Sequence, residues 1–296
     1  PGAVNIRIIP RLDIKGPNLV KGICFEGLRV LGKPEDFARH YYEQGADELV
    51  YQDAVASLYG RNSLLDIVER TAREIFIPLA VGGGLRSLDD MRRVLRAGAD
   101  KVVVNTAATK NPELIAEAAR SFGSSTVVVA VEAMRMPGGG YEALVDYGRD
   151  RTGLDAVQWA RRAAELGCGE IMLTAIHAEG GGKGFDLELT RAVADAVDVP
   201  VIAGGGAGSP EDVLAAVEAG HADAVALASL LHYNVLRDLD GAGRDYSTEG
   251  NTEFLKKGAG FSKVARTSLP EIKRHLAAHG LDMRLPAAAP EEALRA

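Results

Sequence analysis

The chain contains the same run of sequence twice, about 120 residues apart. Ile77–Gly84 reads IPLAVGGG, and Val199–Gly206 reads VPVIAGGG. Each run is followed by an amphipathic stretch and then by a second apolar run, at Gly98–Thr106 and at Gly220–Ser229. Solenoid repeats have periods of roughly 20 to 50 residues, so this repeat is too long to be one of them. It predicts one domain made of two equivalent halves.

Short apolar runs alternate with amphipathic stretches along the whole chain. The predicted strands are Arg7–Asp13, Glu48–Asp53, Ile77–Val81, Lys101–Asn105, Thr126–Val131, Glu170–Ala175, Val199–Ala203 and Asp223–Leu227. The predicted helices are Pro34–Gln44, Ser63–Arg73, Leu88–Ala97, Pro112–Ser121, Leu154–Leu166, Leu187–Val197, Pro210–Ala219 and Ser268–His279. Strands that are apolar on both faces are typical of a parallel sheet covered by helices. The count of eight and the half-repeat predict an α/β fold, a (β/α)8 TIM barrel with its active site at the carboxyl ends of the strands. A doubly wound open sheet is the competing fold, and the same two features favour the barrel.

Three segments interrupt this alternation. Ile14–Gly32 is predicted to be a long loop that forms a mobile lid, and Met136–Asp150 a small excursion such as a hairpin. A polar, glycine-containing insertion is predicted at residues 238–267, within a barrel domain that covers residues 1–285. The tail at residues 286–296, rich in Ala, Pro and Glu, is predicted to be flexible.

The composition excludes several classes of protein. No apolar run is long enough to cross a bilayer, and the absence of a secretion signal predicts a cytoplasmic protein with no membrane partner. The two cysteines, Cys24 and Cys168, are too few for a disulfide framework and lack zinc spacing, so we expect no metal and no cofactor. A net charge of −7 without a basic block argues against nucleic acid as the main partner.

Both repeated glycine runs follow a buried strand, where backbone N–H groups can hold a phosphate. Two such sites that face each other predict a substrate with a phosphate at each end. Asn105-Thr106 and Ala228-Ser229 occupy equivalent places after the fourth and eighth strands, and their donors are predicted to complete the two phosphate cups. Helix N-capping is the alternative role, and it is compatible because a capped helix N-terminus is itself an anion site.

Acidic residues stand at the ends of several predicted strands. Asp13 ends the first strand and Glu132 follows the fifth, so in a barrel their carboxylates flank the mouth from opposite sides. Such a pair can act as general acid and base when the environments separate the two pKa values. The spacing alone leaves a plainer alternative open, in which Asp13 caps a turn and Glu132 is solvated. Asp53 and Glu179 are further strand-end acids, and His177 is assigned no role.

Charged residues also stand at the opposite ends of four strands. They are Arg7, Glu48, Lys101 and Glu170. Their alternating signs predict an ion-paired ring that closes the central channel at the amino ends of the strands. Stability is the usual role of that face, and a gate for a small neutral molecule is the alternative.

Several of these motifs together resemble the cyclase subunit family of imidazole glycerol phosphate synthase. The most specific are RIIPRLDIK at Arg7–Lys15, VGGG at Val81–Gly84, NTAA at Asn105–Ala108 and GGGAG at Gly204–Gly208. The similarity covers about residues 5–236 and 267–285. It implies a barrel that binds a ribulosyl aminoimidazole carboxamide nucleotide with two terminal phosphates. It also implies that ammonia from a glutaminase partner, delivered through the barrel, converts this substrate to imidazole glycerol phosphate and an aminoimidazole carboxamide ribotide.

The resemblance also implies roles for individual residues. Asp13 and Glu132 match the catalytic carboxylates, and Lys21 matches a lid lysine. The matching phosphate-site and substrate-binding residues are Gly84, Asn105 and Thr106 on one side, Gly180, Gly206, Ala228 and Ser229 on the other, and the acids Asp53 and Glu179. The ring of Arg7, Glu48, Lys101 and Glu170 matches the family's ammonia gate, and the glutaminase is implied to dock there as the second subunit of a heterodimer.

The chain also departs from the family pattern. Glu132 and Glu179 stand where aspartate is usual, Arg11 replaces a small residue, and the insertion has no counterpart. These departures resemble a divergent branch associated with surface-polysaccharide sugar amidination, in which the barrel passes ammonia to a sugar amidotransferase. Three functions therefore stay open: a cyclase of histidine biosynthesis, an ammonia conduit, and a phosphosugar isomerase of the same lineage. The phosphate cups and Asp13 favour the cyclase, Glu132 and the insertion favour the conduit, and an isomerase has no need of the gate.

Overall fold

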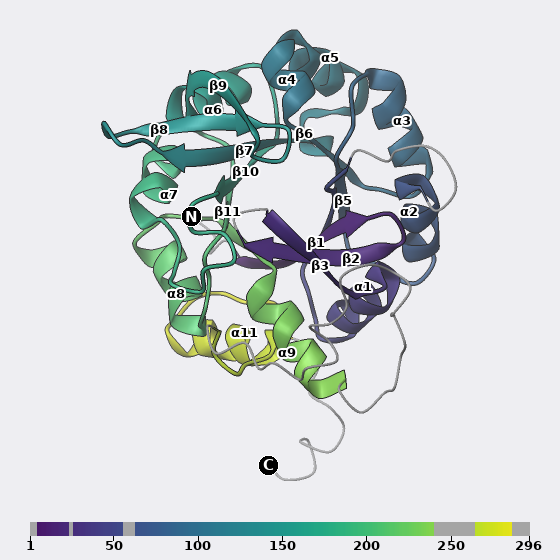
Figure 1. The fold of residues 1–296 in the computed structure, drawn as a ribbon, viewed down its shortest axis with the longest axis vertical. Helices are drawn as coiled ribbons and strands as arrows, with labels where there is room; N and C mark the ends of the chain where they lie inside the picture. The colour runs from purple at the N-terminus through teal and green to yellow at the C-terminus, as the bar shows by residue number, and fades with distance from the viewer. Residues whose placement is uncertain (1–4, 24–25, 56–62, 240–263, 286–296) are drawn as a thin grey trace.

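The computed structural model describes residues 5–23, 26–55, 63–239 and 264–285 of the chain. Eight parallel strands close into a barrel, and helices surround it (Figure 1). In order around the barrel the strands are β1 (Arg7–Lys15), β4 (Leu49–Asp53), β5 (Leu79–Gly82), β6 (Lys101–Val104), β7 (Val127–Arg135), β10 (Glu170–Ala175), β11 (Val201–Gly204) and β12 (Ala224–Leu227). Because β12 pairs in parallel with β1, the sheet has no open edge at this point. The predicted barrel is confirmed, and the open sheet is excluded.

All eight predicted helices are present. They are α1 (Pro34–Glu43), α2 (Leu64–Ala72), α3 (Leu88–Arg96), α5 (Glu113–Phe122), α6 (Ala156–Glu165), α7 (Leu187–Ala194), α8 (Pro210–Glu218) and α11 (Leu269–Ala278). Serines at positions 63, 209 and 268 form capping boxes that fix the starts of α2, α8 and α11. Two further helices, α4 (Thr106–Lys110) and α9 (Ser229–Leu239), begin directly after β6 and β12 and were not predicted as separate elements. A short 3₁₀ helix, η1 (Ser124–Thr126), precedes β7.

The barrel interior is apolar in the middle and charged at both ends. Side chains of a strand alternate between its two faces, so Arg7, Ile9, Arg11 and Asp13 of β1 point to the barrel axis. Ile9 packs inside the barrel with small and medium apolar residues, namely Val50, Ala80, Val103, Val128, Ala130, Met172, Ile202, Ala224 and Ala226. Alternate residues such as Ile8 and Leu12 pack outward, in the larger core between the barrel and the helices. The charged end residues therefore have fixed positions at the two mouths.

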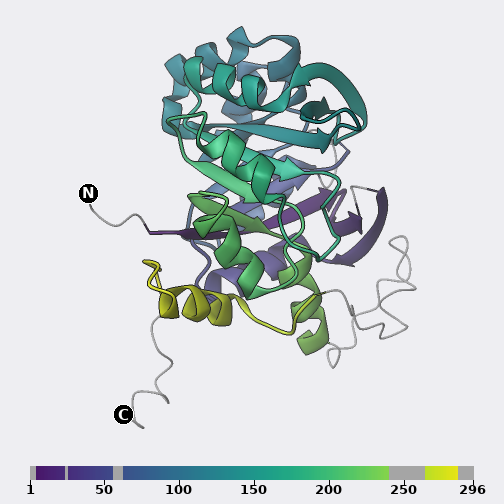
Figure 2. The ribbon, with the colours of Figure 1, turned by 90° about the vertical axis from the view of Figure 1, so that its left-hand side faces the viewer.

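Most described residues of the segment Ile14–Gly32 lie in strands, and its prediction as a loop was wrong. β1 continues to Lys15, and β2 (Asn18–Ile23) pairs antiparallel with it, with Asp13 opposite Val20. β3 (Glu26–Gly32) then pairs with β2. A turn at Gly16, with φ of 60°, permits the reversal. Figure 2 shows the hairpin at the end of the barrel opposite the N-terminus, which is the end where the strands finish.

The predicted excursion after β7 is a second hairpin. β8 (Tyr141–Val145) pairs antiparallel with β7, and β9 (Asp150–Asp155) pairs with β8, so the hairpin extends five residues past its predicted end at Asp150. Its turn contains two non-glycine residues in the left-handed region, Asp146 with φ of 51° and Tyr147 with φ of 57°. Such conformations cost about 1–3 kcal/mol each and concentrate at functional sites. The turn lines the cavity at the mouth of the barrel.

Most of the predicted insertion, residues 240–263, and the tail at 286–296 lie outside the described residues. Asp238 belongs to α9, which therefore runs into the segment predicted as an insertion. Where the description resumes, the backbone N–H of Ala265 donates to the carbonyl of Gly208 at 2.6 Å, and Asn234 donates to the Ala265 carbonyl at 2.9 Å. None of the helices in the described ranges is long and apolar enough to span a membrane.

Candidate active site

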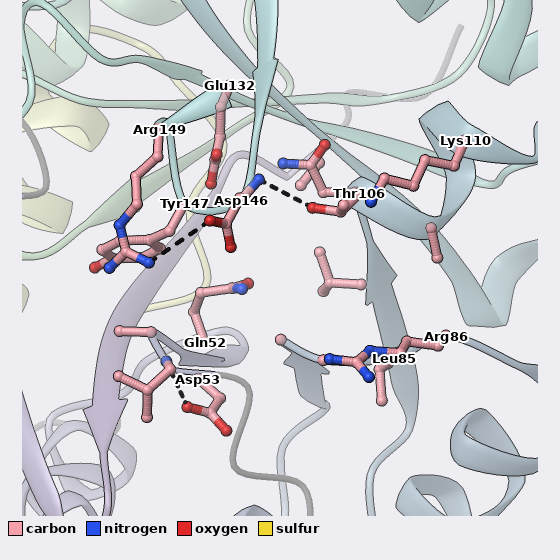
Figure 3. A pocket seen from close by; sticks show the side chains of 18 of the residues that line it. Gln52, Asp53, Leu85, Arg86, Thr106, Lys110, Glu132, Asp146, Tyr147 and Arg149 are labelled. Atoms are coloured by element: carbon pink, nitrogen blue, oxygen red, sulfur yellow. Dashed lines mark hydrogen bonds and ion pairs between the residues drawn. The ribbon is translucent and has the colours of Figure 1, made fainter. Parts of the chain in front are cut away.

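A first cup opens at the carboxyl ends of β4, β5, β6 and β7. Its cavity is about 440 Å³, and it is lined by Gly84, Asn105, Thr106, Asp53 and Glu132 among others (Figure 3). Gly83 and Gly84 have φ of 102° and 70°, which favours glycine. The space is also closed to a side chain at Gly83, because a Cβ there would lie 2.6 Å from the Cβ of Asp53. The glycine run therefore presents backbone at the wall of the cavity.

Two loops meet at this cup. The Thr106 hydroxyl at the start of α4 accepts a hydrogen bond from the backbone N–H of Asp146 at 3.0 Å, as Figure 3 shows. This contact joins the β8–β9 turn to the end of β6. Asp53 lines the cavity, and its Oδ1 accepts a hydrogen bond from the N–H of Val55 at 2.9 Å. Part of the Asp53 carboxylate therefore holds its own loop.

A second cup lies at the ends of β10, β11 and β12, as the half-repeat predicts. It is much smaller, about 20 Å³, and its walls include Glu179, Gly180, Gly206, Ala228 and Ser229. Gly206 has φ of 111°, and a Cβ at this position would collide with the Gly184 carbonyl. The Ser229 hydroxyl is buried at the N-terminus of α9. All four residues predicted for the second phosphate site therefore lie together.

Two buried carboxylates stand at the mouth of the barrel. Asp13 is 1% exposed and Glu132 is 4% exposed, so the alternative of a solvated Glu132 is excluded. The Glu132 Oε2 has no hydrogen-bond partner among the described residues. Burial raises the pKa of Glu132 to about 7; the Arg11 charge opposes this, and the Asp13 charge adds to it. A carboxyl group with this pKa can release or take up a proton near neutral pH, as a general acid or base must.

Arg11 lies below this pair, inside the barrel. Its side chain is 6% exposed, and its Nε donates to Asp13 Oδ1 at 3.1 Å. Its Nη1 donates to Thr174 Oγ1 of β10 at 3.0 Å, so the guanidinium reaches from β1 toward β10. An arginine remains charged under all ordinary conditions. Asp13 therefore forms a buried ion pair with Arg11.

Lys21 of β2 and Glu179 of the loop after β10 form a second buried ion pair. Burial alone would raise the pKa of Glu179, but the charges of Lys21 and Arg11 outweigh it and the pKa lies below its ordinary value. Burial would lower the pKa of Lys21, and Glu179 reverses that shift. The pair fastens the β2–β3 hairpin to the wall of the second cup. Lys21 thus belongs to this hairpin, and its role as a lid lysine stays a prediction.

Sequence reasoning missed two residues of this site. His232 of α9 is fully buried, with Nδ1 2.6 Å from the Tyr41 hydroxyl and Nε2 2.8 Å from the Arg11 carbonyl. Burial lowers the pKa of His232 to about 3, so the ring is neutral, and Nε2 carries the proton donated to the carbonyl. Tyr147 comes from the β8–β9 turn, and burial and the nearby Asp13 carboxylate raise the pKa of its phenol. No sequence motif marks either residue as part of the site, because each reaches the site only through tertiary contacts.

The predicted ring exists at the amino ends of the strands. Arg7 bridges Glu48 at 3.0 Å and Glu170 at 2.6 Å, and Lys101 bridges Glu48 at 3.0 Å and also pairs with Glu170. Burial raises the pKa of Glu48, which the Lys101 charge only partly offsets. Burial acts the same way on Glu170, but hydrogen bonds from Arg7 and Lys101 outweigh it and lower the pKa. The prediction that the four charges form one ion-paired layer is confirmed; their role as a gate stays a prediction.

Comparison with known proteins agrees with this geometry. The family described as histidine biosynthesis protein matches residues 7–237. The imidazole glycerol phosphate synthase subunit HisF of Legionella pneumophila is 58% identical over 208 residues, which are 70% of this chain and 98% of that protein. The subunit of the same name from Desulfovibrio desulfuricans is 44% identical over 284 residues, 94% of this chain and 98% of that protein. The resemblance seen in the sequence is therefore confirmed, and the chain belongs to the histidine biosynthesis protein family.

Proposed function

We propose that this chain is the cyclase subunit of an imidazole glycerol phosphate synthase. It uses ammonia from a glutaminase partner to convert a bis-phosphorylated ribulosyl aminoimidazole carboxamide nucleotide to imidazole glycerol phosphate and an aminoimidazole carboxamide ribotide. One observation carries the proposal: two glycine-walled cups flank a mouth that holds two buried carboxylates. The names of the relatives reported above support the same function.

The two carboxylates have different roles in this proposal. Asp13 lies 3.1 Å from the Arg11 guanidinium, and we assign it the role of proton acceptor, for example for the attacking ammonia nitrogen. Glu132 has a pKa of about 7, so it is the group that still carries a proton near neutral pH and can donate it to the departing nitrogen. Each cup holds one substrate phosphate through the backbone of its glycine run and the hydroxyl of Thr106 or Ser229. The substrate then spans the mouth with its reacting atoms beside the carboxylates.

The amino-terminal face is the proposed docking site of the glutaminase, with which the chain forms a heterodimer. Ammonia passes the ring of Arg7, Glu48, Lys101 and Glu170 and then the apolar barrel interior. Ammonia is small and neutral, so it pays little for crossing an apolar interior, whereas ions are excluded by the cost of desolvation. We place this complex in the cytoplasm, without a cofactor.

A second function has one specific observation in its favour. Glu132 is a methylene longer than the aspartate usual in the family, and a shift of about 1 Å in a reacting group can lower a rate about 100-fold. A barrel so altered could still pass ammonia to a separate sugar amidotransferase. The isomerase alternative has no such support, since it leaves the ring unexplained.

An assay with the bis-phosphorylated nucleotide and an ammonium salt decides between them. We expect formation of imidazole glycerol phosphate and the ribotide by the chain alone. A folded protein that binds phosphate in both cups but gives no product would refute the cyclase and support the conduit. Glutaminase partner and sugar acceptor can then be added separately to test for transfer of ammonia.

A further inference from the structure

We propose that Arg11 fixes the direction in which a substrate with two phosphates lies across the mouth. The half-barrel repeat gives the mouth an approximate two-fold symmetry, with one cup and one carboxylate in each half. A molecule with a phosphate at each end could therefore lie in either of two directions. Arg11 is a charged residue that breaks the symmetry between the cups. The identity of the substrate rests on the proposed function, whereas the difference between the cups does not.

The strand registers show which residues are equivalent in the two halves. β12 pairs with β1 so that Leu227 lies opposite Pro10. β6 pairs with β7 so that Val104 lies opposite Val129. Val104 and Leu227 occupy the same place in the repeated sequence, two residues before Thr106 and Ser229. Pro10 and Val129 are therefore equivalent positions.

Arg11 and Ala130 directly follow those two residues, so they are also equivalent. Arg11 lines the second cup and Ala130 lines the first. A long guanidinium thus stands where the other half has a single methyl group. The cup that Arg11 lines is the smaller one, about 20 Å³ against about 440 Å³.

The two cups also differ in how their positive charge is placed. The Arg11 guanidinium is buried, where a charge-assisted hydrogen bond to a phosphate is strong and salt screens it little. The basic residues at the first cup, Arg86, Lys110 and Arg149, are exposed on its rim, where water weakens their attraction for an anion (Figure 3). The Glu179 carboxylate also lines the second cup, but Lys21 pairs with it, so the Arg11 guanidinium is the charge that an anion meets there. The second cup is therefore the tighter anion site, and the first is the roomier one.

Occupation of the second cup changes the surroundings of Asp13. A cavity of about 20 Å³ has room for about one water molecule, so a phosphate fits only if a lining side chain moves. Two lining residues have long charged side chains, Arg11 and Glu179, and Glu179 is held by Lys21. An anion attracts the Arg11 guanidinium and draws it out of its contact with Asp13. The slimmer phosphate end of the substrate then occupies the second cup, its bulkier end occupies the first, and Asp13 becomes available for proton transfer.

The test measures binding of inorganic phosphate to each cup separately. The backbone amide resonances of Gly84 and Gly206 report the first and second cups in a titration followed by nuclear magnetic resonance. We expect Arg11→Ala to weaken phosphate binding at the second cup by about 10- to 100-fold, the worth of a hydrogen bond to a charged group, and to leave the first cup unchanged. Arg11→Lys, which keeps the charge, should restore part of the loss.

The equivalent position supplies the matched variant. Ala130→Arg should strengthen phosphate binding at the first cup and leave the second unchanged. The proposal would be overturned if Arg11→Ala bound phosphate at the second cup as tightly as the unmodified protein, or more tightly, with an unchanged thermal unfolding curve. These titrations need no turnover, so they stand or fall independently of the cyclase assay.

Discussion

Replacing Glu132 by glutamine should change how the stability of the protein depends on pH. The free energy of unfolding of the variant, minus that of the unmodified protein, should be larger at pH 8 than at pH 4.5. The carboxyl is 4% exposed, and burial raises its pKa from 4.5 to about 7. Glutamine has nearly the same size but carries no charge. The change therefore removes the titration and leaves most of the packing.

The sign follows from the two protonation states. Below pH 4.5 the Glu132 carboxyl is protonated in both the folded and the unfolded chain, so its ionisation contributes nothing. Between pH 4.5 and about 7 the unfolded chain releases the proton while the folded chain retains it, so stability falls as the pH rises. Each unit of difference in pKa corresponds to about 1.4 kcal/mol, which gives a total of about 3 kcal/mol. This is a large fraction of the 5–15 kcal/mol that typically stabilises a domain.

Urea unfolding of both proteins at several pH values between 4.5 and 8 measures this effect. The free energy of unfolding of Glu132→Gln, minus that of the unmodified protein, should grow by about 3 kcal/mol across the range. Glu179→Gln is the control, because the folded-state pKa of Glu179 lies below its ordinary value and its contribution changes only at lower pH. A Glu132→Gln difference that stays constant across the range would show that Glu132 is not held protonated by burial, and its role as the proton donor would be wrong.

Three further changes test the proposed function. Asp13→Asn should lower ammonia-dependent turnover by about 100- to 10,000-fold with an unchanged circular dichroism spectrum; turnover at the unmodified rate would exclude Asp13 from proton transfer. Lys101→Ala should lower activity with glutamine and the partner more than activity with ammonium salt, because it opens the ion-paired ring; equal losses would mean that the ring only stabilises the barrel. Gly206→Ala should raise the KM for the bis-phosphate at least about 10-fold, because its Cβ collides with the Gly184 carbonyl, whereas Gly138→Ala in open space should have no effect on the KM.

The repeated sequence was enough to predict the barrel, because closed α/β architecture follows from the number and alternation of its elements. Periodicity also located the eight main helices to within a few residues. Periodicity failed for α9, Ser229–Leu239. Among the side chains of this helix that the structure describes, those from Leu230 to Val235 are all buried, so the helix has no exposed polar face that periodicity could detect. It failed for α4 because five residues are too few to show a period.

The site was predictable where it depends on strand ends and hidden where it depends on contacts between distant elements. Asp13, Glu132 and the two cups follow from the rule that strand carboxyl ends meet at one face. The β2–β3 hairpin was taken for a loop because its pairing with β1 is a tertiary contact, with glycines inside the segment that suggest irregular backbone. Arg11 left one usable signal: it stands two residues before Asp13, on the same inward face of the strand.

The same equivalence that relates the two cups also relates the two carboxylates. Asp13 follows Arg11 by two residues, and Glu132 follows Ala130 by two, so the acids occupy matching places in the two halves. A symmetric pair would titrate alike, yet a reaction that both removes and delivers a proton needs one acceptor and one donor. The Arg11 guanidinium lies 3.1 Å from Asp13 as its ion-pair partner, whereas burial raises the pKa of Glu132 to about 7. One arginine in one half therefore differentiates both the anion cups and the acid–base pair of a duplicated barrel.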